Sequence, residues 1–425
     1  MLVSVDALRP EFYQQETWPM PVVQQLARDG SSARTVLSVF PALTYPAHTS
    51  IVTGALPARH GIWHNRPFEP GGQSGRWLWE ASAITAPTLW DAVHGAGGTT
   101  AAIAWPVTVG ASAITWNVPD VWPLDFGDGM APIRAAMTPP ELIAELEREA
   151  TGRLRDENFS ISRLVREDRV GAIAAYLFER YRPTLLLVHC IGADHVQHLH
   201  GRETPLLRRA LGAVDRAIGQ VLDTVERLGL RDRTTFIITG DHGSADVHTQ
   251  LRPNVWLAAA GLMEPRADRG RWRATFLASG GSAFLELCDA EDAEAVTLVE
   301  RILAAQPSRI RALLRVVDRT ELTRLGADPV SPLALVAMPG IELHESAEGP
   351  ALRPAVGAAH GYLPTTPAMH TGFVAAGAGV RPGIIAPELR LEDIAPLVAT
   401  LLGLDFTAPD GVLMPGLILP RGRAP

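Results

Sequence analysis

The sequence predicts an α/β fold in which a mostly parallel central sheet is covered on both faces by helices. Short apolar runs typical of buried strands alternate along the chain with longer segments whose apolar residues recur at helical spacing. The strand-like runs are apolar throughout, which is the pattern of parallel strands buried on both faces. With 425 residues and 47% hydrophobic content, the chain is large enough to bury one extensive core.

The first part of the chain supplies most of the expected elements. Strands are expected at residues 1–5, 33–39, 99–104, 184–190 and 234–238. Helices are expected at 21–28, 44–52, 88–94, 140–150, 165–180 and 206–227, several of them bounded by Gly or Pro. Ligand sites in such sheets lie beyond the carboxyl ends of the strands. Asp6, Asp194 and Asp241 each follow a strand and are therefore expected to converge.

The pattern changes in residues 252–356. Strand-like runs at 284–287, 312–317 and 333–337 and a helix at 290–305 predict a small α/β lobe. This lobe would be inserted into a catalytic domain made of residues 1–251 and 357–425. The closing segment adds a strand at 371–376 and a helix at 391–402.

Composition excludes several classes of protein. The net charge of -8 argues against a partner that is a nucleic-acid polymer, because such binders carry a basic surface. All 38 basic residues are arginine, so no lysine can form a Schiff base. The sequence shows neither a signal-peptide pattern nor an apolar run long enough to cross a bilayer, which predicts a cytoplasmic protein with no membrane partner. It does not indicate an oligomeric state.

Cysteine usage does not indicate a disulfide framework. Cys190 and Cys288, the two cysteines, end strand-like apolar runs. They are expected to be buried free thiols.

Thr44 and Asp6 are the first two candidates for chemistry. Thr44, in FPALTYPAHTSIVTG, stands where a helix should begin, and free N–H groups at a helix start attract phosphoryl groups. A threonine hydroxyl becomes a nucleophile only if a metal or a base deprotonates it. Alone, Thr44 reads as a helix cap and Asp6 as a turn or cap residue.

The remaining candidates combine aspartate with histidine. Asp194 and His198 are four residues apart, so on a helix they share a face and can bind one metal ion, zinc being suited to this ligand pair. His195 and His200 are expected to lie beside that ion or on the surface without binding it. Asp241 and His242, in TGDHGS, follow a buried strand. Together these clusters predict a functional metal site at the sheet edge.

The motifs resemble those of the alkaline-phosphatase superfamily and, within it, the type I phosphodiesterase/nucleotide pyrophosphatase family. SVDALRP, FPALTYPAHTSIVTGALPARHGI, ADHVQHLHG, TGDHGS and HGY occur in the family's order over nearly the whole chain. The resemblance implies an alkaline-phosphatase-like fold that holds two metal ions, zinc or alternatively manganese. One ion would be bound by Asp194, His198 and His360, and the other by Asp6, Asp241, His242 and the oxygen of Thr44.

The resemblance also implies a reaction. Thr44 would be the nucleophile and form a covalent intermediate, and Asn65 in GIWHNRPF would contact a phosphate oxygen. The expected substrate is a small phosphodiester of nucleotide type. His360 is chosen over His370 because the family places its ligand in an HG pair, which His360-Gly361 matches.

The sequence departs from the family near the expected substrate position. Leu363-Pro364 stands where many relatives carry Asp-Asn, and Val-Thr-Val-Gly follows Trp105-Pro106 in place of a Gly-Ser turn. Nucleotide specificity therefore stays open, as does base stacking by a tryptophan such as Trp77 or Trp122.

Several related activities remain as alternatives. A phosphomonoesterase would call for an inward cation such as Arg59 or Arg66. A phosphonate hydrolase of the same superfamily is thought to use lysines, which the chain lacks. A metal-binding pseudoenzyme would be expected to have lost one or more metal ligands or the nucleophile. A sulfatase needs a cysteine or serine at the nucleophile position, so Thr44 excludes that chemistry.

Overall fold

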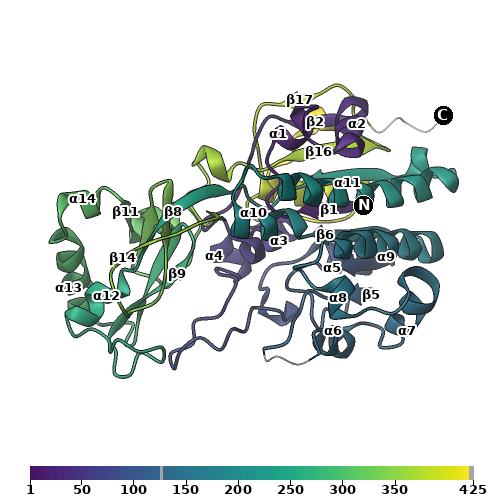
Figure 1. Ribbon diagram of the computed structural model, residues 1–425. Helices are drawn as coiled ribbons and strands as arrows, with labels where there is room; N and C mark the ends of the chain where they lie inside the picture. Colours follow the sequence, from purple (N-terminus) through teal and green to yellow (C-terminus); the bar gives the residue numbers. More distant parts are fainter. Residues whose placement is uncertain (125–127, 421–425) are drawn as a thin grey trace.

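The central sheet of the molecule lies between two layers of helices (Figure 1). The computed structural model describes residues 1–124 and 128–420. Within them, the sheet has eight strands in the order β17-β2-β16-β7-β1-β6-β4-β5. These are β1 (Leu2–Val5), β2 (Ser31–Ala33), β4 (Thr100–Ile103), β5 (Trp116–Val118), β6 (Leu185–Cys190), β7 (Thr235–Thr239), β16 (Phe373–Gly377) and β17 (Ile385–Ala386).

The predicted fold class is confirmed. Strands β7, β1, β6, β4 and β5 are parallel, whereas β16 is antiparallel to both β7 and β2. The expected strand at 33–39 is wrong, because the chain changes partners after Ala33. Arg34 donates its N–H to the Ala386 carbonyl, and the Thr35 carbonyl accepts from Leu389. A separate strand, β3 (Val36–Leu37), then pairs with β18 (Leu389–Arg390) outside the sheet.

Alternation along the central strands sends side chains to two cores. In β1, Val3 and Val5 join one core and Leu2 the other. The first core is covered by α1 (Glu11–Gln14), α2 (Pro21–Asp29), α6 (Met130–Ala136), α7 (Leu142–Leu146), α8 (Asp156–Phe159), α9 (Val165–Tyr181), α10 (Gly192–His200) and α11 (Pro205–Arg227). The second is covered by α3 (Thr44–Thr53), α5 (Leu89–Gly95) and α16 (Ile394–Leu402). Short α4 (Pro57–His60) follows α3.

Residues 252–356 lie to the left in Figure 1 and contain a second sheet. It is antiparallel, in the order β11-β12-β10-β9. Its strands are β9 (Ala274–Ser279), β10 (Ser282–Leu287), β11 (Leu314–Asp318) and β12 (Leu333–Ala337), and its helices are α12 (Asn254–Ala259), α13 (Ala293–Ala304), α14 (Ser308–Arg311) and α15 (Arg319–Arg324). We refer to residues 252–356 as the lobe.

A third sheet connects the lobe with the rest of the chain. Strand β8 (Ala245–Leu251) pairs with β13 (Gly340–Leu343), β14 (Leu352–Pro354) and β15 (Ala358–Ala359). This sheet contains residues from both sides of the expected boundaries at 252 and 356. The division into a domain of residues 1–251 and 357–425 and an inserted lobe stays a prediction.

Two further expectations concern exposure. Cys190 is buried in β6, as expected, but Cys288 is exposed. The expectation for Cys288 is wrong because the residue lies just beyond the end of β10, where the chain leaves the sheet. Among the described residues, no helix combines the length and the apolar character needed to cross a membrane.

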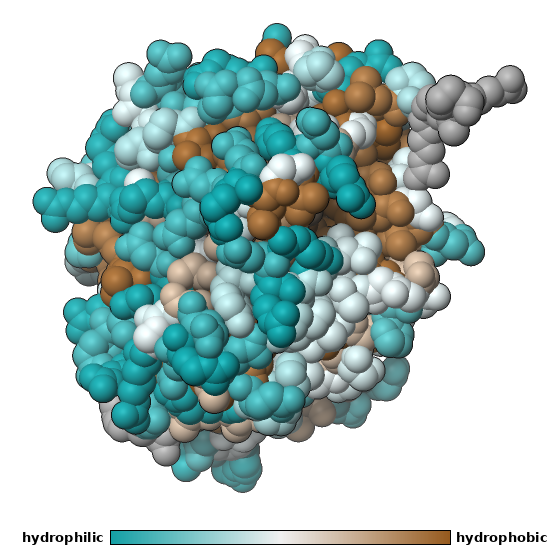
Figure 2. Space-filling model, turned by 90° about the vertical axis from the view of Figure 1, so that its right-hand side faces the viewer, coloured by the Kyte–Doolittle hydropathy of each residue, from teal (hydrophilic) through white to brown (hydrophobic). Residues whose placement is uncertain are grey.

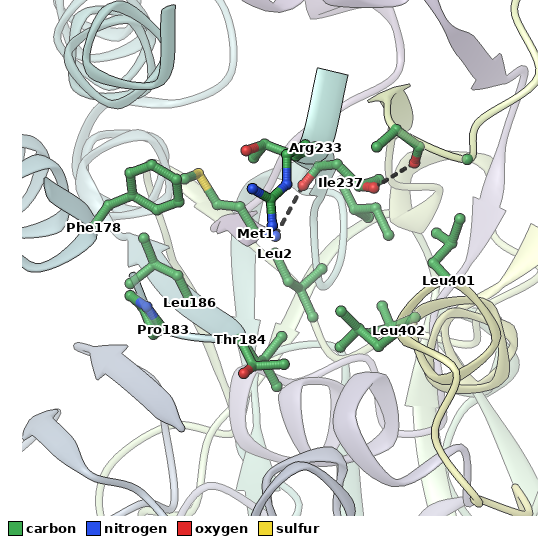
Figure 3. A pocket seen from close by; sticks show the side chains of 16 residues that line it. Met1, Leu2, Phe178, Pro183, Thr184, Leu186, Arg233, Ile237, Leu401 and Leu402 are labelled. Carbon is green, nitrogen blue, oxygen red and sulfur yellow. Dashed lines mark hydrogen bonds between the residues drawn. The ribbon is translucent and has the colours of Figure 1, made fainter. Parts of the chain in front are cut away.

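The amino-terminal edge of the central sheet carries a pocket of about 240 Å³. Figure 2 shows this face, where apolar side chains emerge among polar ones. Phe178, Leu186 and Leu402 line the pocket, and the Met1 amino group donates to the Thr235 carbonyl at 2.9 Å beside it (Figure 3). Ligand sites in open α/β sheets form at the opposite, carboxyl edge, so we assign no site to this pocket.

Leu187 provides a test of the core. It is 0% exposed in β6, at the centre of the sheet. The substitution Leu187→Ala is expected to lower the free energy of unfolding by about 2–5 kcal/mol, since it leaves a cavity. Leu352→Ala, at a residue 37% exposed, should cost well under about 1 kcal/mol. Denaturant titration followed by tryptophan fluorescence would measure both, and equal losses would contradict the assignment of Leu187 to the core.

Candidate metal centre

The three adjacent central strands β7, β1 and β6 deliver aspartates to one edge of the sheet. Val5 is in register with Cys190, and Ser4 with Thr239, so these strands end at nearly the same level. Asp6 directly follows β1, Asp241 follows β7, and Asp194 lies in the first turn of α10, which follows β6. The predicted convergence is therefore present.

Asp194, His198 and His360 form the first group, with one possible ligand atom from each within 4.8 Å of the others. Asp194 and His198 lie on successive turns of α10, and His198 Nε2 is 3.2 Å from Asp194 Oδ2. The His360 ring is held through Nδ1, which bonds to the Ala42 carbonyl at 2.9 Å. That bond leaves Nε2 as the free ligand atom. His370 is not part of the group.

Asp6, Asp241 and His242 form the second group, all of them buried. Asp241 Oδ1 accepts the N–H groups of Ala7 and His242, so Oδ2 is left to face the site. His242 Nδ1 bonds to the Gly243 carbonyl, and Nε2 lies 3.3 Å from Asp241 Oδ2 and 3.5 Å from Asp6 Oδ1. A Cβ atom at Gly243 would lie 2.1 Å from the Ala368 carbonyl oxygen, which explains the glycine after Asp241-His242.

The two groups are in contact. The imidazole rings of His242 and His360 stack at a centroid distance of 3.7 Å. The turn between β9 and β10 supports this stack, because Gly281 donates its N–H to the His360 carbonyl at 2.7 Å. A Cβ atom at Gly281 would lie 2.3 Å from the Tyr362 ring, so the turn approaches this closely only with glycine.

Thr44 is the first residue of α3, as expected, and its hydroxyl faces the second group. Oγ1 lies 3.4 Å from His242 Nε2. Within the described residues, the Thr44 N–H has no hydrogen-bond acceptor, so a free donor stands beside the hydroxyl. Asn65 Oδ1 accepts the next N–H along the helix, that of Tyr45, at 2.9 Å. The Asn65 amide is thereby oriented with Nδ2 as its remaining donor.

Electrostatics indicate that this centre is built for cations. Asp6 Oδ1, Asp194 Oδ1 and Asp241 Oδ2 are buried oxygens without a hydrogen-bond partner among the described residues. Burial raises the pKa of Asp6 well above its usual range, and the charges of Asp241 and Asp194 raise it further. Burial likewise raises the pKa of Asp241 to about 6. Clustered, unpaired carboxylates beside imidazole nitrogens fit divalent metal ions.

His198 and Asp194 behave as an ion pair. Burial acts to raise the pKa of Asp194, but His198, His360 and His242 together outweigh burial and hold that pKa below its usual range. In turn, Asp194 raises the pKa of His198 to about 9. The imidazoles of His242 and His360 differ, because burial lowers the pKa of His242 to about 4 and that of His360 well below its usual range. Neutral imidazoles can donate a lone pair to a metal.

Two histidines beneath the centre are not singled out by the sequence. His48 Nδ1 bonds to the Thr44 carbonyl at 2.8 Å and lies 3.6 Å from Asp241 Oδ2. His189 Nε2 lies 3.3 Å from Asp6 Oδ2. Both rings are fully buried, with centroids 4.2 Å apart. The sequence signal that could have identified His189 is its position inside the apolar run that forms β6, because a buried ionisable side chain needs a partner.

Aromatic side chains pack around Tyr45, the residue after Thr44. Tyr45 packs edge-on against Trp77 at 5.0 Å, and Trp77 against Trp122 at 4.8 Å. The Tyr45 hydroxyl donates to Asp120 at 3.2 Å. Tyr45 is buried, whereas Trp77 and Trp122 are half-buried.

The two arginines that follow Thr44 most closely in the sequence are engaged by carboxylates. Arg59 pairs with Asp410 at 3.2 Å, and Arg66 pairs with Glu345 at 3.6 Å. Neither of these carboxylates belongs to the two metal-binding groups.

Comparison with known proteins identifies the family of this chain. A family model described as type I phosphodiesterase / nucleotide pyrophosphatase matches residues 1–363. The chain belongs to this family. The type I phosphodiesterase/nucleotide pyrophosphatase family comprises phosphodiester hydrolases, and the order of motifs along the chain is thereby explained.

Relatives within the family are distant in sequence. An uncharacterized pyrophosphatase/phosphodiesterase of Schizosaccharomyces pombe is 24% identical over 277 residues, which cover 64% of this chain and 50% of the relative. The bis(5′-adenosyl)-triphosphatase of Mus musculus is 24% identical over 417 residues, covering 97% of this chain and 79% of the relative. The chain spans half or less of the length of the first curated relatives it matches.

Solved structures of the family share the fold. Murine ectonucleotide pyrophosphatase/phosphodiesterase 5, as an inactive threonine-to-alanine variant in complex with AMP, superimposes with a TM-score of 0.70 at 22% identity, covering 97% of this chain and 96% of that one. The human counterpart gives a TM-score of 0.68 at 21% identity, with the same coverage. The fold of this family member is thus established by structure as well as by sequence.

The raised pKa of Asp241 predicts how the metal-free protein responds to pH. A carboxyl whose pKa rises from 3.8 to about 6 on folding contributes stability that is present below pH 3.8 and is lost as the pH rises through 6. The side chain of the Asp241→Asn variant does not ionise, so the variant does not lose this stability as the pH rises. Its Oδ1 can still accept the same backbone N–H groups. In EDTA, the variant should exceed the parent in unfolding free energy by on the order of 2 kcal/mol at pH 7.5, and by little at pH 4. A difference independent of pH, measured by denaturant titration, would contradict the assignment.

Proposed function

We propose that the chain hydrolyses phosphodiesters of nucleotide type, with Thr44 as nucleophile and two metal ions, zinc or alternatively manganese, as cofactors. The observation that carries this proposal is the position of the Thr44 hydroxyl, 3.4 Å from His242 Nε2, where two groups of metal-ligating side chains meet. A hydroxyl in that position can act as the nucleophile in two-metal hydrolysis, because a metal ion beside it would deprotonate it.

Each group supplies the donors for one ion. Asp194, His198 and His360 would hold one, and Asp6, Asp241, His242 and Thr44 Oγ1 the other. Nitrogen and carboxylate oxygen donors of this kind suit zinc, with manganese as the alternative. When bound, the ions supply positive charge that lowers the pKa of the threonine hydroxyl and neutralises the phosphate.

The residues of the chain then carry out an in-line displacement. Thr44 Oγ1 attacks phosphorus, a covalent phosphothreonine ester forms, and the alcohol departs. The free Thr44 N–H and Asn65 Nδ2 are placed to bind non-bridging oxygens, as donors fixed before the reaction begins. Water then hydrolyses the ester and restores the hydroxyl.

Charge favours a diester over a monoester. A monoester carries one more negative charge and calls for an additional cation. Arg59 and Arg66 are instead paired with Asp410 and Glu345, and the chain has no lysine. The centre already contains three aspartates, which disfavour a second charge on the substrate unless another cation compensates for it.

Two half-buried tryptophans favour a nucleotide-like leaving or retained group. Trp77, which packs against Tyr45, and Trp122 keep part of their ring surface exposed, and bases can pack against such surface. The structural relative that binds AMP and the relative named as a bis(5′-adenosyl)-triphosphatase agree with this substrate class. Leu363-Pro364 and Val107-Thr108 leave the choice of base open.

Replacement of the nucleophile tests the mechanism. Thr44→Ala should lower kcat by at least about 10³-fold, because no other hydroxyl takes its place, while the protein still binds metal through the remaining carboxylate and imidazole donors. Metal analysis and initial rates on the same preparation would measure both effects. Full activity in the variant would remove Thr44 from its role. Loss of metal would contradict the expectation that Asp6, Asp241 and His242 hold their ion without the Thr44 oxygen.

Substrate preference tests the specificity. Initial rates of the zinc-loaded protein on bis-p-nitrophenyl phosphate and p-nitrophenyl phosphate should give a higher kcat/KM for the diester, by about tenfold or more, which corresponds to about 1.4 kcal/mol. The Thr44→Ala variant is the control for background hydrolysis. A preference for the monoester would instead make the chain a phosphomonoesterase, with the metal centre unaffected.

A further inference from the structure

A further group of possible metal ligands, separate from the two groups at Thr44, lies where the loop after α4 meets the lobe. His64, Glu286 and Asp328 each offer one ligand atom within 4.8 Å of the other two. His64 Nε2 is 3.3 Å from Asp328 Oδ2. The three residues come from separate parts of the chain, namely the loop before Asn65, strand β10 and the segment after α15.

The orientation of Asp328 is fixed by the backbone. Its Oδ1 accepts the N–H groups of Val330 at 2.7 Å and Ser331 at 3.3 Å. Oδ2 is therefore the oxygen that faces His64. Asp328 is 3% exposed, so its carboxylate is shielded from water.

The orientation of His64 is fixed by packing. Its ring lies edge-on to Phe284 of β10, with centroids 4.7 Å apart, and Phe284 in turn packs against Phe40. His64 is 6% exposed. The imidazole is thus a buried donor aimed at Asp328 and held by aromatic contacts with the lobe.

Glu286 completes the group as a carboxylate without a partner. Among the described residues, its side chain has neither a hydrogen bond nor an ion pair. Arg269 is the nearest candidate, but its guanidinium donates to the carbonyl oxygens of Glu69 and Pro70. Burial raises the pKa of Glu286 to about 7, and Asp328 adds to this effect, whereas His64 and Arg269 oppose it. The carboxylates of Glu286 and Asp328 repel each other, and a cation between them would relieve this repulsion.

We infer that His64, Glu286 and Asp328 form a third metal site, which binds one divalent transition-metal ion of the zinc or manganese type. One imidazole and two carboxylates are the donor set of such ions, whereas calcium and magnesium prefer oxygen donors alone. Glu286 also lines a surface pocket of about 390 Å³ beside β10.

The consequence of this site is mechanical. An ion there ties β10 and the segment after α15 to the loop that ends in Asn65. Asn65 Oδ1 in turn binds the Tyr45 N–H next to the nucleophile. The third ion would therefore fix the lobe relative to Asn65. This inference does not rest on the proposed role of Thr44.

Metal counting tests the inference. Protein saturated with zinc and freed of excess by gel filtration is analysed by inductively coupled plasma mass spectrometry. The parent chain should hold three ions, and Glu286→Gln and Asp328→Asn should each hold one fewer. Glu291→Gln is the matched control, because Glu291 lines the same pocket and belongs to none of the groups of possible metal ligands. Equal zinc content in the parent and both variants would overturn the inference.

The difference between parent and variants separates this inference from the proposed function. If the proposed catalytic pair were wrong, the parent would bind fewer than three ions, yet Glu286→Gln would still lose one. If both variants failed to fold, as judged by circular dichroism, crystals of the unaltered protein grown with zinc decide the matter. An anomalous peak between His64, Glu286 and Asp328 supports the site, and its absence at full occupancy of the other two sites overturns it.

Discussion

The burial of Asp6, Asp194 and Asp241 at one edge of the sheet is the constraint on which the rest of this structure depends. Three carboxylates lie within electrostatic reach of one another and out of water. Such an arrangement is costly unless positive charge compensates it. The surrounding imidazoles and the start of α3 lie at this edge. Hydrogen bonds between the Nδ1 atoms and carbonyl groups orient the imidazoles. The three aspartates meet there because β7, β1 and β6 are adjacent parallel strands that end at the same edge.

The fixed orientation of the donors explains why the site involves so many distant segments. His360 is aligned by a carbonyl of the segment before α3, and His242 by its own turn. Beneath them, His48 and His189 contact Asp241 and Asp6. Donors held in this way lose little conformational freedom on binding an ion or a phosphate, which favours catalysis by a preformed site.

Much of this centre can be predicted from sequence because local spacing determines it. The interval of four between Asp194 and His198 requires only a helix, and Asp6 and Asp241 require only that strands end where the apolar runs end. His360 is different, since only the resemblance to a family identified it, and its position depends on contacts with Ala42 and the β9–β10 turn. His48 and His189 were not singled out as site residues, because a histidine in an apolar segment reads as core. The strand expected at 33–39 is wrong for a related reason. A hydrophobic pattern predicts which residues are buried, but it does not predict which strand a segment pairs with. The backbone hydrogen-bond partners of this segment change after Ala33.

The glycine turn between β9 and β10 has a consequence for how this chain can diversify. Gly281 binds the His360 carbonyl and allows contact with Tyr362, so the lobe is part of the framework that holds a site residue. Recombination that exchanged residues 252–356 for an unrelated insert would remove that support. Point changes on the outer surface of the lobe are therefore tolerated more easily than exchange of the whole segment. The lobe has to be inherited together with the domain into which it folds.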